Sequence, residues 1–196
     1  SKSLQVGKNV KISVNDSEVT PTGSWTVDIA MKTFDVSSSI HIGSNLVRMT
    51  IAQECSVENH TQPPIKPKLL GAFSIGENGS TLQMQKKYMR SGSWTDQGYP
   101  YYSGSGAYRQ TIFVPEFARG QKIILHADRP ADSLEFVING RLAGLREWAP
   151  YEVDITSFVA PGPNTIELRI TNSLANIMQS EPRPSGLLGG IRAFLA

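Results

Sequence analysis

Short runs of alternating apolar and polar residues constrain the fold of this chain more than any other feature. In "TIELRIT" (165–171), Ile166, Leu168 and Ile170 share one face, and the polar residues between them share the other. "YRQTIFV" (108–114) and "KIILHAD" (122–128) alternate in the same way. A period of two with one apolar face is typical of half-buried antiparallel strands. Clusters of Gly, Pro, Asn, Asp and Ser separate the runs, and the pattern contains no long amphipathic helix. The sequence therefore predicts an all-β fold, an antiparallel β-sandwich.

The chain also repeats itself, since residues 14–51 parallel residues 138–170. The matched pairs are Asn15 with Asn139, Trp25 with Trp148, Asp35 with Asp154, and Asn45 with Asn164. Each copy places its second asparagine in a Gly-x-Asn turn, and a strand of the same phase follows. A fixed order of matched positions indicates two related β-units.

The repeat and the turn residues predict the domain organisation. We expect a partial β-sandwich unit over 1–57, a proline-containing linker or crossing segment over 58–73, and a complete unit over 74–196. The first unit lacks strands that the second has before its Asn-Gly turn. Two explanations stay open: the first unit is a partial sandwich, or its missing strands lie upstream of Ser1.

Composition excludes several partners. The formal charge is +2, and the cationic residues are scattered among acids, so we expect no nucleic-acid partner. No apolar run has the length of a membrane span, so we expect no membrane partner. Cys55 is the single cysteine and forms no intrachain disulfide. The histidines at 41, 60 and 126 have no metal-ligand spacing, so the sequence identifies no cofactor or metal site.

Four motifs occur in an order that resembles a known family. They are a Tyr-Arg strand start in "AYRQTIFVP", a Val-x-Asn-Gly hairpin in "VINGRL", an Asp-Ile-Thr turn, and a Gly-x-Asn strand start in "PGPNTIELRI". Residues 94–196 resemble the galactose-binding-like jelly-roll domain attached to glycoside hydrolases. The similarity is to the sugar-binding domain of family 2 enzymes and to accessory sandwiches of bacterial rhamnosidase-type hydrolases.

The resemblance implies a galactose-binding-like jelly roll, with the N-terminal unit as a partial relative. It implies a non-catalytic accessory region of a larger, secreted or periplasmic bacterial glycoside hydrolase. This region would brace the catalytic domain of the same parent chain and contact carbohydrate. Domains of this fold often hold a structural calcium through loop carbonyls, and this point stays open. The alternative is a purely structural or protein-interaction module without sugar affinity, because one fold serves many functions.

Candidate ligand-binding residues lie in two segments. The first is "GYPYYSGSGAYRQ" (98–110) with the tryptophan just before it, where aromatic rings could stack on sugar rings. Its candidates are Trp94, Tyr99, Tyr101 and Tyr102. The alternative interpretation is that this segment has a packing role and leads into a core strand.

The second segment, "GLREWAPY" (144–151), contributes Arg146 and Trp148. Loops held by a rigid scaffold often carry binding residues. Trp25, however, occupies the matching position in the first unit, which favours a packing role. A third hypothesis, that the chain is itself an enzyme, requires two carboxylates at a defined separation in one cleft. No catalytic residue can be assigned from the sequence.

Overall fold

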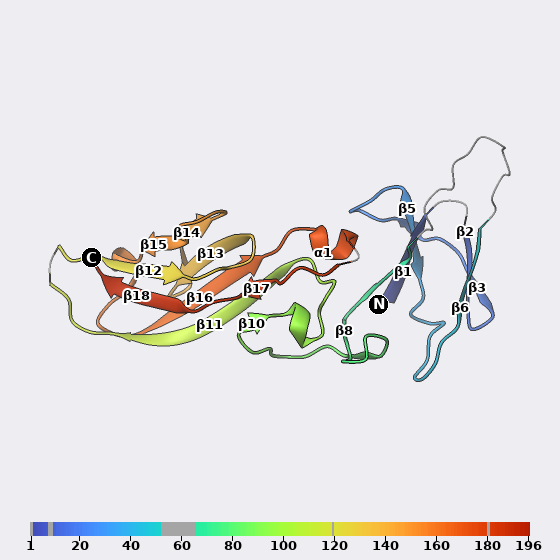
Figure 1. Cartoon of the computed structure of the whole chain (residues 1–196), viewed down its shortest axis with the longest axis horizontal. Helices are drawn as coiled ribbons and strands as arrows, with labels where there is room; N and C mark the ends of the chain where they lie inside the picture. Colours follow the sequence, from blue (N-terminus) through green and yellow to red (C-terminus); the bar gives the residue numbers. More distant parts are fainter. Residues whose placement is uncertain (1, 8–9, 52–65, 119, 180) are drawn as a thin grey trace. The chain divides into compact units, whose positions relative to one another are not determined.

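A computed structural model describes residues 2–7, 10–51, 66–118, 120–179 and 181–196. The chain forms two compact units, Ser1–Phe73 and Ser74–Ala196. Both consist of antiparallel strands, as Figure 1 shows, so the predicted all-β sandwich class is confirmed. None of the helices in the described ranges is long and apolar enough to cross a membrane.

The first unit contains two sheets. One has the strand order β4-β5-β1-β7, and the other has the order β3-β2-β6. The strands are β1 (Lys2–Gly7), β2 (Val10–Val14), β3 (Ser17–Val19), β4 (Gly23–Ser24), β5 (Met31–Asp35), β6 (Val47–Ile51) and β7 (Lys68–Gly71). A cluster of buried apolar side chains from both sheets forms the core, including Leu4, Ile12 and Phe34. Part of the predicted linker, 58–73, therefore forms strand β7, and residues 58–65 of it lie outside the described residues.

The second unit is built on two larger sheets, with strand orders β11-β16-β13-β14 and β15-β12-β18. Their strands are β11 (Ser105–Val114), β12 (Ile123–Ala127), β13 (Ser133–Ile138), β14 (Arg141–Arg146), β15 (Glu152–Asp154), β16 (Gly162–Thr171) and β18 (Ile191–Leu195). Smaller elements are β8 (Phe73–Ile75), which starts at the unit boundary, β9 (Leu82–Met84), β10 (Gly92–Ser93), β17 (Gly186–Leu187), the 3-10 helices Thr95–Gln97 and Thr156–Phe158, and α1 (Ala175–Met178).

The faces predicted from the alternation agree with the structure. Ile166, Leu168 and Ile170 of β16 are buried, whereas Phe113 on the other face of β11 is 76% exposed. The buried face joins apolar side chains of β12, β13 and β15 in one core cluster between the two sheets. Burial of apolar area is the main stabilising contribution to such a sandwich.

Two asparagines tie the hairpin of the second unit to the start of its central strand. Asn139 Nδ2 donates to Asn164 Oδ1 at 2.8 Å, and Asn139 Oδ1 accepts from the backbone N–H of Thr165 at 2.8 Å. Asn164 Nδ2 in turn donates to the carbonyls of Ala160 and Gly162. Asn139 has φ of +49°, a conformation that asparagine tolerates better than most residues. We call this pair of side chains and its bonds the asparagine clasp.

The first unit contains the same clasp. Asn15 Nδ2 donates to Asn45 Oδ1 at 2.9 Å, and Asn15 Oδ1 accepts from the N–H of Leu46 at 2.9 Å. Asn45 Nδ2 donates to the carbonyls of His41 and Gly43. Asn15 also has φ of +49°. The sequence repeat thus corresponds to a repeat of individual hydrogen bonds.

The strand pairings follow the same equivalence. Leu4 faces Phe34 across β1 and β5, as Leu125 faces Val153 across β12 and β15. The turn aspartates match as well, because Asp35 accepts from the N–H of Ser37 and Asp154 from that of Thr156. The repeat does not extend to the tryptophans. Trp25 is 7% exposed and Trp148 is 73% exposed, so their matched positions carry no common packing role.

The two clasps differ in burial, and this predicts different contributions to stability. Asn164 is 3% exposed, whereas Asn45 is an exposed residue. Replacing Asn164 with alanine removes a buried amide together with its bonds to Asn139, Ala160 and Gly162, and should lower the free energy of unfolding of the second unit by about 2–3 kcal/mol. Asn45→Ala, where water can replace the lost bonds, should lower that of the first unit by about 1 kcal/mol.

Urea unfolding followed by amide NMR signals assigned to each unit measures both effects. Each variant serves as the control for the other unit, whose signals should keep their midpoint. Equal losses of unfolding free energy in Asn164→Ala and Asn45→Ala would contradict the conclusion that burial determines how much each clasp contributes.

Candidate functional site

The aromatic residues before β11 form a cluster in which the rings pack edge to face. Trp94 and Tyr102 have ring centroids 5.7 Å apart at an interplanar angle of 78°, and Tyr99 and Tyr102 are 6.4 Å apart at 71°. Trp94 is 1% exposed, Tyr99 is half-buried, and Tyr102 is 42% exposed. A sugar platform requires an open ring face, and the ring of Trp94 lies inside the core.

Close backbone packing explains the burial of Trp94. A Cβ atom on Gly106 would lie 2.8 Å from the indole ring, so only glycine fits beneath it. The backbone N–H of Trp94 donates to the carbonyl of Ser185 at 3.0 Å. Tyr108 is held nearby, because its hydroxyl donates to the Gly92 carbonyl and accepts from the Leu187 N–H. Burial raises the pKa of the Tyr108 phenol.

The outer tyrosines also have structural bonds. The Tyr99 hydroxyl accepts from the N–H of Lys86 at 2.8 Å, and the Tyr102 hydroxyl donates to the Ser105 carbonyl at 3.0 Å. Tyr101 is 48% exposed. The structure therefore brings Trp94, Tyr99 and Tyr102 together as a packing cluster, and Tyr101 presents the most exposed ring of the segment.

Arg146 and Trp148 lie at the opposite edge of the same sheet. The register pairs Ser105 of β11 with Thr171 of β16, and Leu134 of β13 with Arg146 of β14. Both predicted segments thus lie at one end of the sheet, but β16 and β13 separate them by about 14 Å at the usual strand spacing. Trp148 is largely exposed, and Arg146 Nη1 donates to the Leu145 carbonyl. The predicted candidates do not form one site.

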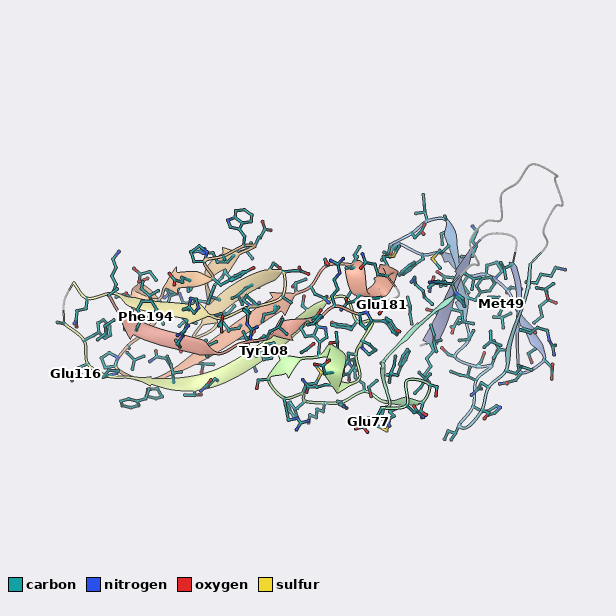
Figure 2. The ribbon with its side chains drawn as sticks, viewed as in Figure 1. Met49, Glu77, Tyr108, Glu116, Glu181 and Phe194 are labelled. Carbon is teal, nitrogen blue, oxygen red and sulfur yellow. The ribbon has the colours of Figure 1, made fainter. Side chains whose placement is uncertain are left out.

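A groove that the sequence did not reveal lies before the tyrosine-rich segment. It has a volume of about 870 Å³ and lies between the β8–β9 hairpin and residues 86–100. Its lining includes Glu77, Asn78, Gln83, Lys86, Tyr88, Arg90, Asp96, Gln97 and Pro100. Glu77, on its hairpin side, is labelled in Figure 2.

Gln97 holds one wall of the groove in place. Its Oε1 accepts from the N–H of Arg90 at 2.8 Å, and its Nε2 donates to the carbonyls of Arg90 and Ser93. Lys86 Nζ donates to the Gln97 carbonyl at 2.7 Å. On the hairpin side, Asn78 Oδ1 accepts from the N–H groups of Ser80 and Thr81. Both walls are fixed by side-chain bonds to the backbone.

The groove combines an exposed aromatic ring with charged and amide groups. Tyr88 is 81% exposed, and Lys87 Nζ lies 5.4 Å from the centre of its ring. An apolar ring face beside a few polar groups is the composition that saccharide sites use. The density of tyrosines in 98–110 predicts ligand contact there and gives no signal for Tyr88, which lies outside that segment. The available signal was the concentration of Asn, Gln, Lys, Arg and Tyr over 77–97.

Glu167 forms an ion cluster on the outer face of the large sheet. Its carboxylate accepts from Nε of Arg169 at 2.6 Å and from Nε of Arg109 at 2.8 Å, and Arg109 Nη2 also contacts it. These bonds, first that from Arg169 and then that from Arg109, hold the pKa of Glu167 below its usual range. Glu135 adds an ion pair with Arg169 at 3.7 Å.

The turn aspartates show shifts in the same direction. The hydroxyl and N–H of Thr156 lower the pKa of Asp154, and the corresponding groups of Ser37 lower that of Asp35. A glycosidase general acid needs a raised pKa. The carboxyl groups of Glu167, Asp154 and Asp35 therefore favour the ionised state, which suits a structural role.

The described residues offer no group of three or more His, Cys, Asp or Glu side chains that could hold a metal ion. His126 Nδ1 instead lies 3.1 Å from Glu152 Oε1. His60 and Cys55 lie outside the described residues. The calcium implied by the resemblance stays a prediction.

Comparison with known proteins points to glycoside hydrolases. No protein-family model matches the sequence. The chain is 30% identical over 89 residues to a protein of Formosa agariphila described as "Putative beta-glucuronidase", covering 43% of this chain and 8% of that one. The chain thus spans less than a tenth of the length of this relative.

Solved structures of glycoside hydrolases resemble this chain with TM-scores below 0.5. The rhamnosidase of Novosphingobium sp. PP1Y is 17% identical, with a TM-score of 0.47, over 97% of this chain and 21% of that one. A Bifidobacterium dentium beta-glucuronidase is 28% identical, with a TM-score of 0.38, over 41% and 14%.

The ion cluster at Glu167 predicts an acid-sensitive second unit. Because the folded pKa lies below the unfolded one, the carboxylate stabilises the fold above the unfolded pKa. That contribution is lost as the pH falls through the folded pKa. Glu167→Gln should flatten this part of the pH dependence and lower stability at neutral pH.

Urea unfolding of the second unit at a series of pH values measures the effect. Glu116→Gln is the matched control, because it makes the same charge change at an exposed residue after β11. A wild-type acid slope that persists unchanged in Glu167→Gln would contradict the assignment.

Proposed function

We propose that residues 1–196 are a non-catalytic β-sandwich region of a larger carbohydrate-active enzyme, a glycoside hydrolase. The observation that carries this proposal is the 30% identity over 89 residues to a much longer protein described as a beta-glucuronidase. The order of jelly-roll motifs in the sequence supports it. The partners would be carbohydrate and the catalytic domain of the same parent chain, in a periplasmic or extracellular location.

A structural role for three of the acids supports a non-catalytic function. Glu167, Asp154 and Asp35 have lowered pKa values and are held by arginines or turn hydroxyls. Acid catalysis of glycoside hydrolysis uses a carboxyl group that stays protonated near neutral pH. The groups around Glu167, Asp154 and Asp35 favour the ionised state instead.

We place glycan contact in the groove of residues 75–100. Tyr88 offers a largely exposed aromatic ring, and Gln83, Arg90 and Asp96 line the same groove as hydrogen-bonding groups. The wall fixed by Gln97 reduces the entropy lost when a ligand binds. The groove is open, so affinities in the millimolar range are expected, about 4 kcal/mol of binding free energy.

The alternative, a purely structural module, has its own support. Tyr102 contacts Trp94 and Tyr99 edge to face, and the hydroxyls of Tyr99 and Tyr102 bond to the backbone, which is how aromatic residues stabilise a fold. Under this alternative the groove has no sugar affinity, and the region only braces a neighbouring domain.

Titration with neutral and uronic-acid oligosaccharides, followed by NMR chemical shifts, separates the two proposals. We expect shifts at residues 76–98 in the wild type. Tyr88→Ala should weaken binding by about 5–10-fold, since a stacked ring contributes about 1 kcal/mol or more.

Trp148→Ala is the matched control, because it removes an exposed aromatic ring outside the groove lining. It should leave affinity unchanged. If no oligosaccharide shifts any groove signal at tens of millimolar, the structural alternative holds. If Trp148→Ala weakens oligosaccharide binding and Tyr88→Ala does not, the glycan site does not lie in the groove of residues 75–100.

A further inference from the structure

Strand β6 forms an edge that its counterpart in the second unit does not have. Within the ranges that the structure describes, β6 pairs with β2 alone, in the order β3-β2-β6. Its counterpart β16 lies between two strands, β13 on one side and β11 on the other. Strands β6 and β16 can be compared residue by residue because the asparagine clasps fix the equivalence.

The register gives that equivalence directly. Val14 of β2 pairs with Val47, as Ile138 of β13 pairs with Ile166. The next inward pair is Ile12 with Met49 in the first unit, and Phe136 with Leu168 in the second. Val47 therefore corresponds to Ile166, and Met49 corresponds to Leu168.

Burial differs sharply at these two positions. Val47 is 40% exposed and Met49 is 37% exposed, whereas Ile166 and Leu168 are each 1% exposed. Figure 2 labels Met49 on this strand. Several other equivalent core positions are buried in both units, namely Leu4 and Leu125, Val6 and Ala127, Ile12 and Phe136, Val14 and Ile138, Phe34 and Val153, and Val36 and Ile155. Val10 of β2, the counterpart of Leu134, is half-buried, so the loss of burial is largest on β6 and extends to the strand paired with it.

In the second unit, strand β11 pairs with β16 along the edge that is unpaired on β6 in the described residues. Tyr108 pairs with Leu168, and Gln110 pairs with Ile166. Tyr108 and Ile112 pack against the core cluster, and Val114 belongs to it. An added strand therefore both completes the backbone pairing of an edge and extends the apolar layer over its inward side chains.

We propose that β6 is a docking edge, completed in the whole protein by an extended strand of the same polypeptide that lies before Ser1. This strand pairs antiparallel with β6 and places apolar side chains over Val47 and Met49. The position follows from topology, because β11 directly precedes β12 through residues 115–122, and β12 corresponds to β1. The inference does not depend on the proposed glycan function.

The chemistry of β6 fits such a neighbour. Its inward residues are apolar, and its intervening residues, Arg48 and Thr50, are polar, matching Glu167 and Arg169 of β16. Arg48 forms an exposed ion pair with Asp16 at 3.3 Å. The docked strand should therefore alternate as β11 does, with apolar residues facing the sandwich interior.

Amide hydrogen exchange tests the proposal. Residues 1–196 are compared with a longer form that includes about 20 native residues before Ser1, enough for a strand and its connection. In the longer form the amides of β6 that point away from β2 should exchange at least about 100-fold more slowly, because they gain a backbone acceptor. Amides of β16 are the internal control and should exchange equally slowly in both forms.

Substitution at the edge gives a second readout. Met49→Lys should abolish the added protection in the longer form and change little in residues 1–196, where this side chain is already partly exposed. Arg48→Ser, the neighbouring outward position, should leave the protection intact in both forms.

Two results would overturn the proposal. One is unchanged exchange of the β6 amides in the longer form while β16 stays protected. The other is protection of β6 in residues 1–196 that rises with protein concentration, which would identify a second copy of the chain as the partner. A gain in protection that Met49→Lys removes and Arg48→Ser does not would support it.

Discussion

The asparagine clasp determines the geometry of both units. In each, one asparagine at a left-handed turn position bonds to a second asparagine at or just before the start of the strand that pairs with the hairpin. The second asparagine then closes its own turn through two backbone carbonyls. A hairpin and a strand distant in sequence are thereby held in one register, and the apolar faces of the sheets meet across the core. Few other interactions connect so many backbone groups through two side chains.

The asparagine clasp occurs in two units whose cores differ in the number of strands that cover them. In the second unit it lies beside a buried strand with neighbours on both edges, and Asn164 itself is nearly inaccessible. In the first unit the corresponding strand is an edge, and Asn45 is exposed. Local bonding therefore specifies the fold of each unit, while burial determines how stable that fold is. The groove of residues 75–100 lies on the more complete unit.

Much of the fold was predictable because strand faces and turn asparagines leave a local signal. Ile166, Leu168 and Ile170 alternate with polar neighbours, and Asn139 precedes glycine. The site was less predictable. The burial of Trp94 depends on Gly106 and Ser185, which are distant in sequence from each other. The groove around Tyr88 depends on Gln97 bonding back to residues 90 and 93, which no spacing rule encodes.

One β-unit occurs twice in this chain, and we propose that the first copy lacks a strand of its core. Urea unfolding of residues 1–73 and of residues 74–196, prepared separately, tests it most directly. The account predicts a cooperative transition for 74–196, and a marginal or absent transition for 1–73, whose buried cluster is small. A cooperative transition of equal free energy for residues 1–73 would contradict it.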